Sequence, residues 1–286
     1  MVKIKANAKI NLTLDILGRR ADGYHEVEMV MQSVGLFDEI SLKRTEKGIS
    51  LAMDTAELAA DRTNLAWRAA ELFFQETGQS GGVEIFIKKS IPVAAGLAGG
   101  SADAAGVLRG MNELFGTGLS QAALCRLGER LGSDVPFCIV GGTMLATGRG
   151  EVLRELPAMP ECYVVLAKPP VAVSTAWAYR RYDECGSAVR PDNRAVEAAL
   201  AKGNLKAIGS LLCNVLEAVT SAEYKEISAY EQLMLASGAM AVRMSGSGPT
   251  VFALTDSREK AEKIAEAVRR SADAEAVCAV TISGRN

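Results

Sequence analysis

The residues best suited to chemistry form a glycine-rich segment made of Pro92, Val93, Ala94, Ala95, Gly96, Leu97, Ala98, Gly99, Gly100, Ser101 and Ala102. Its glycines lack a Cβ, so the backbone can turn sharply and approach a bulky anion. An alternating run before it predicts a strand over 83–89, and the pattern after it predicts a helix over 101–114. A loop between a strand and a helix gathers unpaired N–H groups at the positive end of the helix dipole. We therefore predict a phosphate cradle rather than an ordinary tightly packed loop.

The segment matches neither of the two common nucleotide-binding loops. A P-loop closes with Gly-Lys followed by Ser or Thr, and this tripeptide does not occur in the chain. A dinucleotide-binding loop has the spacing G-x-G-x-x-G directly after a strand. Here Gly96, Gly99 and Gly100 are spaced differently, and Pro92 lies where that strand would still continue. Both loops are excluded.

Phosphoryl transfer also needs a group that orients or deprotonates the attacking hydroxyl, and Asp134 is the candidate base. It stands alone in an apolar segment between Gly132 and Phe137. Taken by itself this segment favours a helix cap, with a catalytic carboxylate as the alternative. Lys9 interrupts a strand-like segment; it would stabilise the Asp134 carboxylate and polarise the hydroxyl, or it would protect a strand edge. Asn11 lies two residues on and shares the face of Lys9.

Ser101 within the predicted cradle, and two lysines just before it, are further candidates. Ser101 would cap the following helix, would help to hold Mg²⁺ beside the β-phosphate, or would do both. Lys88 and Lys89 precede the loop, and on an alternating strand only one of them faces the cleft. We take Lys89 as the lysine that reaches the phosphates, with Lys88 as the alternative.

Aromatic residues in both halves of the chain are suited to enclosing a pyrimidine base. Stacking of a base on an aromatic ring contributes about 1–3 kcal/mol. Such an aromatic pair would combine Tyr24 from the first half with Tyr179, or alternatively Trp177, from the second. Thr175 opens the second aromatic segment, and we expect it to contact the substrate as well. His25 would recognise the edge of the base, although a lone histidine is by default a structural residue.

The bulk composition excludes several classes of function. A net charge of −2 with 23% charged residues provides no basic surface for nucleic acid or an anionic membrane. No apolar run is long enough to span a membrane and no signal peptide is evident, so we expect a cytoplasmic location. The six scattered cysteines and the single histidine exclude a zinc site, and no G-x-S-x-G elbow indicates a hydrolase triad. The oligomeric state is left open.

The predicted elements indicate an α+β protein of two domains. The first half has strands over 3–6, 11–17, 28–34 and 38–42, then helices from about residue 61 and from Ser120. Pro157 and Pro160 bracket a polar connector, so we predict domains over 1–156 and 157–286. The second half has strands over 163–167, 241–244, 250–254 and 276–282, and helices over 193–201, 205–215, 222–236 and 257–270. This order predicts a ferredoxin-like α+β domain.

Several segments, in order along the chain, resemble the motifs of the GHMP kinase family. The central one reads Pro-x3-Gly-Leu-x3-Ser-x2-Ala-Ala from Pro92; the others span residues 6–27, 132–142 and 243–252. The resemblance implies an N-terminal catalytic domain with a left-handed-type βαβ nucleotide loop, a ferredoxin-like C-terminal domain, and use of ATP with Mg²⁺. It makes Asp134 the catalytic base and places Asn11, Tyr24 and Tyr179 on the substrate.

The opening segment and the acidic segment resemble one branch of this family most. That branch phosphorylates the 2-hydroxyl of a cytidine diphosphate-linked methylerythritol in the non-mevalonate isoprenoid precursor pathway, so we expect this small-molecule acceptor. The rivals are a GHMP kinase that acts on another small alcohol and a silent member that binds nucleotide without turnover. The turn over 245–250 is either a plain hairpin or a wall of the cleft. Because alanine adopts left-handed angles at a cost, we expect negative φ at Val93, Ala94, Ala95 and Ala98.

Overall fold

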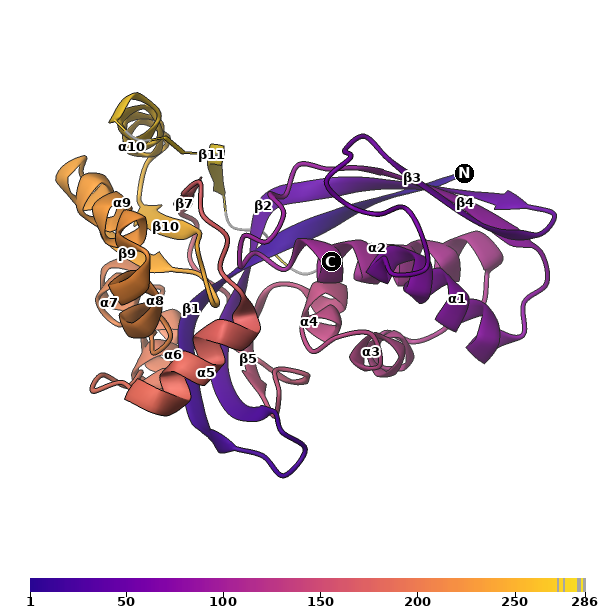
Figure 1. Cartoon of the computed structure of the whole chain (residues 1–286), viewed down its shortest axis with the longest axis horizontal. Helices are drawn as coiled ribbons and strands as arrows, with labels where there is room; N and C mark the ends of the chain where they lie inside the picture. Colours follow the sequence, from indigo (N-terminus) through magenta and orange to yellow (C-terminus); the bar gives the residue numbers. More distant parts are fainter. Residues whose placement is uncertain (272, 275, 282–283, 285–286) are drawn as a thin grey trace.

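Two long antiparallel strands, β1 (Val2–Arg19) and β2 (His25–Thr45), run through the middle of the molecule (Figure 1). The sequence predicts four shorter strands here, which is wrong because the pairing continues across the polar positions. Register shifts between Asn7 and Lys9 and between Asn11 and Thr13 absorb the irregularities. The computed structural model describes residues 1–271, 273–274, 276–281 and 284.

The other strands of the first sheet extend this central pair. They are β3 (Gly48–Met53), β4 (Gly82–Lys88), β5 (Thr143–Thr147), β6 (Val152–Glu155) and β8 (Cys213–Asn214). The sheet has the order β3-β4-β2-β1-β8, with β5 pairing to β2 and β6 pairing to β5. Only β4 of these strands is predicted by the sequence.

Three helices pack on one face of this sheet: α1 (Leu65–Thr77), α2 (Gly99–Phe115) and α4 (Val135–Val140). Helix α3 (Gln121–Glu129) packs on α4 and α2 (Figure 1). Helix α2 packs closely on β2 because it carries glycine where it meets the sheet. A Cβ on Gly106 or Gly110 would lie 2.4 Å from the Cδ1 atom of Ile40 or Leu42. This packing fixes the start of α2, and with it the glycine-rich loop.

The second half forms an antiparallel sheet with the order β11-β7-β10-β9. Its strands are β7 (Tyr163–Lys168), β9 (Ala241–Met244), β10 (Val251–Thr255) and β11 (Ala276–Thr281). Its helices are α5 (Thr175–Cys185), α6 (Asn193–Ala201), α7 (Leu205–Ser210), α8 (Glu217–Glu223), α9 (Lys225–Ala236) and α10 (Arg258–Ser271).

The prediction for this half needs three corrections. Helix α5 is absent from the prediction. The helix predicted over 205–215 ends at Ser210, and the one predicted over 222–236 is divided at Tyr224 into α8 and α9. The prediction that the last strand reaches Ile282 falls outside the described residues.

The α+β class is confirmed. The predicted division at 156/157 falls in the connector between β6 and β7, although Cys213 and Asn214 return to pair with Thr13 and Leu14 of β1. No helix in the described part of the chain combines the length and apolar character needed to cross a membrane.

Candidate active site

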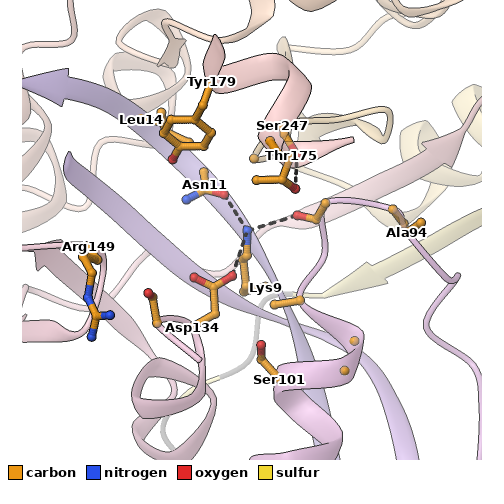
Figure 2. Close-up of a pocket in the computed structure, with 18 of the residues that line it drawn as sticks. Lys9, Asn11, Leu14, Ala94, Ser101, Asp134, Arg149, Thr175, Tyr179 and Ser247 are labelled. Atoms are coloured by element: carbon orange, nitrogen blue, oxygen red, sulfur yellow. Dashed lines mark hydrogen bonds and ion pairs between the residues drawn. The ribbon is translucent and has the colours of Figure 1, made fainter. Parts of the chain in front are cut away.

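A cavity of about 1100 Å³ is lined by residues from both halves of the chain (Figure 2). It brings together most of the residues that the sequence singles out. Of the predicted site residues, those on its wall are Lys9, Asn11, Tyr24, His25, Lys89, Pro92, Val93, Ala94, Ala95, Gly96, Ala98, Gly99, Gly100, Ser101, Asp134, Thr175 and Tyr179. Leu97 and Ala102 are buried behind the loop instead.

The glycine-rich loop contacts the turn that follows β9. Gly96 has φ of 73°, and a Cβ there would lie 2.4 Å from the carbonyl oxygen of Ser245. The Ser245 hydroxyl donates to the Gly96 carbonyl oxygen at 3.1 Å. The segment 245–250 is therefore a turn that also forms part of the cavity wall. Glycine is required at position 96 because its φ is positive and because a Cβ would clash with this segment.

Two alanines of the loop adopt left-handed angles, so the expectation of negative φ is wrong at these positions. Ala94 has φ of 51° and Ala98 has φ of 60°, whereas Val93 and Ala95 keep the expected sign. Ala98 is the residue before α2, and its carbonyl oxygen accepts the N–H of Ala102 at 2.8 Å. The left-handed turn at Ala98 directs the chain into the helix, at a cost of about 1–2 kcal/mol for a residue with a Cβ.

The start of α2 supplies donors to the cavity. The helix begins at Gly99, so Ser101 lies in the first turn and is not the capping residue. The N–H groups of Gly99, Gly100 and Ser101 have no partner within the helix, because the first turn has no preceding carbonyl groups. The Ser101 hydroxyl lines the cavity and makes no hydrogen bond to another described residue. These donors and the helix dipole suit a phosphate group.

Lys9 connects the loop with the candidate base. Its ammonium group donates to Asn11 Oδ1 at 2.7 Å and to the Gly96 carbonyl oxygen at 3.0 Å, and it lies 3.9 Å from Asp134 Oδ2. The Lys9 side chain is buried and belongs to a central strand. Figure 2 shows all three contacts converging on the ammonium group. Such a lysine does not protect an exposed strand edge.

Asp134 precedes α4 in the capping position, yet its side chain caps nothing. The carboxylate accepts no hydrogen bond from the helix, and 32% of the side chain is exposed. The capping interpretation therefore fails, although the position is that of a cap. The carboxylate is free to accept a proton from a molecule in the cavity.

Lys89 lies at the base of the loop between two buried carboxylates. Its ammonium group is 2.5 Å from Asp38 and 2.7 Å from Asp103, whereas the neighbouring Lys88 is exposed and pairs with Glu39 at 3.4 Å. Burial raises the pKa of Asp103 to about 7, against the opposing effect of Lys89. Burial also disfavours the Lys89 charge, but the two carboxylates outweigh it and raise its pKa. Asp38 further accepts the N–H groups of residues 90 and 91, which anchors the chain entering the loop.

Aromatic side chains line another part of the cavity. The rings of His25 and Tyr179 have centroids 4.8 Å apart, and His25 Nε2 lies 2.8 Å from Asp183 Oδ1. Burial raises the pKa of Tyr179, and the charge of Asp134 adds to this effect. Tyr24 is 57% exposed.

Two further observations concern the opening of α5. Trp177 packs against Tyr224 with ring centroids 5.5 Å apart and is not on the cavity wall, whereas Tyr179 lines the cavity. Thr175 shares a hydrogen bond of 3.0 Å with Ser247. This contact joins α5 to the turn after β9.

Sequence reasoning missed three contributors to the site. Asp38 and Asp103 are buried in a strand and in a helix, and only the fold shows that they meet Lys89. Arg149, which lines the cavity, stands between Gly148 and Gly150. The Gly-Arg-Gly pattern is typical of a turn that carries a positive charge. Arg149 was therefore identifiable from the sequence.

Comparison with known proteins identifies the family. Residues 64–142 match the description "GHMP kinases N terminal domain", and residues 196–274 match "GHMP kinases C terminal". A 4-diphosphocytidyl-2-C-methyl-D-erythritol kinase of Pelotomaculum thermopropionicum is 49% identical, over 93% of each chain. The chain belongs to the GHMP kinase family. A kinase of the same name from Brevibacillus brevis is 46% identical over 94% of this chain and 92% of its own.

Solved structures of GHMP kinases have the same fold. A 4-(cytidine 5'-diphospho)-2C-methyl-D-erythritol kinase has 34% identity and a TM-score of 0.85, over 99% of this chain and all of the other. A homoserine kinase from Cytophaga hutchinsonii has 21% identity and a TM-score of 0.77, over 99% of this chain and 95% of the other, which shows the fold alone. As a member of this family, the chain is a small-molecule kinase that uses ATP.

Proposed function

We propose that this GHMP kinase transfers the γ-phosphoryl group of ATP to the 2-hydroxyl of 4-diphosphocytidyl-2-C-methyl-D-erythritol. One observation carries the choice of acceptor. The rings of His25 and Tyr179 meet in the same cavity as Lys9 and Asp134. A cytosine ring stacks well on such groups, whereas mevalonate and homoserine have no ring to stack. The relatives at 46–49% identity bear the name of this activity.

The reaction requires little covalent chemistry from the protein. The acceptor oxygen bonds to the γ-phosphorus as the bond to the β,γ-bridging oxygen breaks, and ADP leaves. Asp134 takes the hydroxyl proton, while Lys9 donates a hydrogen bond to the acceptor oxygen and balances the negative charge beside it. Asn11 positions the Lys9 ammonium group through the hydrogen bond of 2.7 Å. His25, Tyr24 and Tyr179 hold the base.

The cradle over 92–102 binds the phosphates of ATP through its N–H groups. Lys89 supports this loop from below through Asp38 and Asp103. Mg²⁺ shields the phosphate charge in such reactions and accepts a hydroxyl oxygen as ligand, which fits the unengaged Ser101 hydroxyl at the start of α2. The described residues contain no group of three His, Cys, Asp or Glu side chains placed to hold a metal ion. Phosphate oxygens and water would therefore supply most of its ligands.

The test measures ADP release with the cytidine-linked acceptor, mevalonate, homoserine and galactose in parallel. We expect turnover with the first acceptor alone. Turnover with another acceptor in its place would assign the enzyme to a different branch of the family. Absence of turnover with all four, in a protein that still binds ATP, would indicate a silent member. The Asp134→Asn variant controls for contaminating kinases.

A further inference from the structure

The turn between β5 and β6 brings a guanidinium group to the cavity. Arg149 is carried by this turn and lines the cavity. A Cβ on the next residue, Gly150, would lie 3.9 Å from Asp134 Oδ1, so the turn adjoins the reacting centre. Figure 2 draws Arg149 and the loop residue Ala94 on opposite sides of Lys9 and Asp134. Arg149 is thus placed on the side of the reacting centre away from the ATP cradle.

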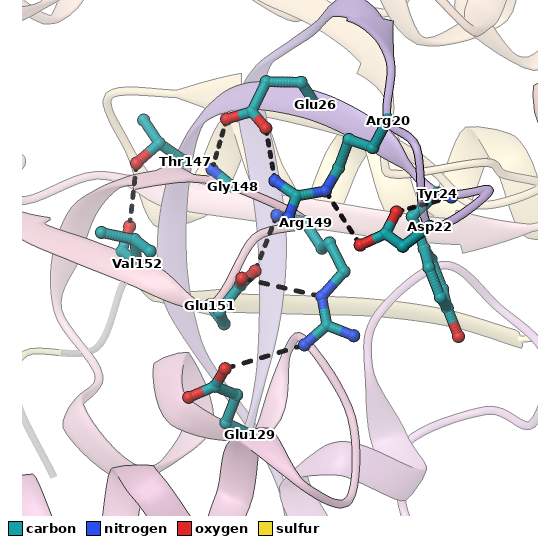
Figure 3. Close-up of polar contacts among 10 residues, drawn as sticks. All are labelled: Arg20, Asp22, Tyr24, Glu26, Glu129, Thr147, Gly148, Arg149, Glu151 and Val152. Carbon is teal, nitrogen blue, oxygen red and sulfur yellow. Dashed lines mark hydrogen bonds and ion pairs between the residues drawn. The ribbon is translucent and has the colours of Figure 1, made fainter.

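Hydrogen bonds from the β1–β2 hairpin hold the backbone of this turn (Figure 3). The N–H of Gly148 donates to Glu26 Oε1 at 3.2 Å, and the Gly148 carbonyl accepts the N–H of Val27 at 2.8 Å. Arg20 donates to the other oxygen of Glu26 at 2.6 Å. Arg149 therefore extends from a backbone whose position is already fixed.

The guanidinium group itself is only loosely paired. It lies 3.6 Å from Glu151 and 3.7 Å from Glu129, which is beyond hydrogen-bonding distance. Glu151 instead accepts the backbone N–H of Arg149 at 2.7 Å. The group also lies over the ring of Tyr24, at 5.2 Å from the centroid. Arginine has five N–H donors, and none from this side chain is hydrogen-bonded to another described residue.

We propose that Arg149 binds the diphosphate of the nucleotide-linked acceptor. This inference rests on the proposed function, because the diphosphate joins cytidine to methylerythritol and must lie between the base and the reacting hydroxyl. Arg149 spans that interval, with Tyr24 on one side and Asp134 on the other. The planar guanidinium group matches two phosphate oxygens at once. Glu129, whose side chain is 47% exposed, gives up its loose contact when the diphosphate binds.

The experiment titrates cytidine and CDP into the protein with the ATP cradle occupied by ADP. A charge-assisted hydrogen bond lost from an anion weakens binding by about tenfold to a hundredfold, so we expect Arg149→Ala to lose that much affinity for CDP. Its affinity for cytidine should match that of Arg154→Ala, a control that removes an exposed arginine paired with Glu197 outside the cavity. Arg149→Lys should be intermediate for CDP, because it keeps the charge and loses the planar fork.

The outcomes separate the two proposals. If the wild-type protein binds neither cytidine nor CDP, the proposed acceptor is wrong. If both bind and Arg149→Ala weakens them equally, Arg149 only supports Tyr24 and the diphosphate contact is refuted. The diphosphate contact is also refuted if Arg149→Ala binds CDP with the same affinity as the wild-type protein.

Kinetics give a readout that a purely structural role would not produce. Arg149→Ala should raise KM for the cytidine-linked acceptor, leave KM for ATP unchanged and largely retain kcat. An equal rise in both KM values would mean that the cavity has changed shape, which contradicts the proposal. Glu129→Gln should strengthen CDP binding, since it removes a carboxylate that competes for the guanidinium group; weaker binding would count against the contact.

Discussion

The Lys9 ammonium group lies 3.9 Å from the Asp134 carboxylate, and its two shorter contacts, to Asn11 and to the Gly96 carbonyl oxygen, hold it there. Lys9 is therefore fixed by groups other than Asp134. In the proposed reaction the acceptor hydroxyl would lie between this ammonium group and the carboxylate. Removal of the Asp134 side chain therefore leaves the Lys9 ammonium group held by Asn11 and Gly96.

The substitution Asp134→Asn should reduce kcat by about 10²–10⁴-fold, the usual contribution of a general base. The carboxylate caps no N–H group of α4, so the melting temperature and ATP binding should stay close to wild type. Turnover, calorimetry and ATP titration of the same preparation check this. Near-normal kcat would remove Asp134 from the catalytic role.

The substitution Lys9→Met should also reduce kcat strongly. The reductions in kcat caused by Lys9→Met and by Asp134→Asn should not be independent of each other. If Lys9 and Asp134 act on one hydroxyl, the double variant Lys9→Met/Asp134→Asn loses little more than the worse single variant. Rates of the three variants under saturating ATP measure this. Multiplication of the two losses would show that the residues act independently.

The catalytic roles expected for Lys9 and Asp134 come from the resemblance to the GHMP kinases, because the local pattern favours a helix cap at Asp134 and leaves a strand-edge role open at Lys9. The local pattern marks Lys9 as a charge within a strand-like segment, Asp134 as a charge within an apolar one, and the glycines around residue 96 as a phosphate cradle, with a tightly packed loop as the alternative. The fold class followed from the order of elements. The missed helix α5 buries only Ala178 and Tyr182, so it lacks the apolar periodicity on which such a prediction depends.

Other features depend on contacts between distant segments. The left-handed angles of Ala94 and Ala98 are imposed by the path of the loop into α2, which composition does not show. The carboxylates around Lys89 come from β2 and α2, 51 and 14 residues away in the chain. No local pattern predicts that such residues meet.

The neighbouring lysines Lys88 and Lys89 offer a matched pair of substitutions. Lys89→Met leaves two buried carboxylates without their cation, and breaking a buried pair in this way costs about 3–5 kcal/mol. Lys88→Met removes an exposed ion pair, which is worth about 0–1 kcal/mol. Urea unfolding compares the two. Equal stabilities would mean that Lys89 is not the anchor of the loop.

The substitution Gly96→Ala should displace the cradle. The added Cβ would meet the Ser245 carbonyl oxygen at 2.4 Å at a φ of 73°, so both the contact and the backbone angle oppose it. We expect a loss of more than about 1 kcal/mol in unfolding free energy and a raised KM for ATP. Gly18→Ala is the control, because nothing lies within 4 Å of its Cβ position and its φ is not positive. An ATP KM equal to that of this control would contradict the expected displacement.

The carboxyl group of Glu231 in α9 makes stability depend on pH. Burial, and then the negative charge of Glu217, raise its pKa from 4.5 to about 8, and one of its oxygens has no hydrogen-bond partner among the described residues. The folded state therefore keeps a proton that the unfolded state has already lost. The unfolding free energy due to Glu231 falls as pH rises from 4.5 to about 8 and is constant above that range.

The substitution Glu231→Gln removes this pH-dependent loss of unfolding free energy, because the amide is neutral at every pH. The amide still donates a hydrogen bond to Glu217, as the protonated acid does. Relative to wild type, the variant should therefore gain stability between pH 6 and pH 9 in urea unfolding. Taking the difference between the two proteins cancels the titration of Asp103, which both retain. Glu226→Gln, on the exposed side of the same helix, changes the surface charge equally and should show no such gain. An identical gain in this control would assign the effect to net charge rather than to the buried carboxyl group.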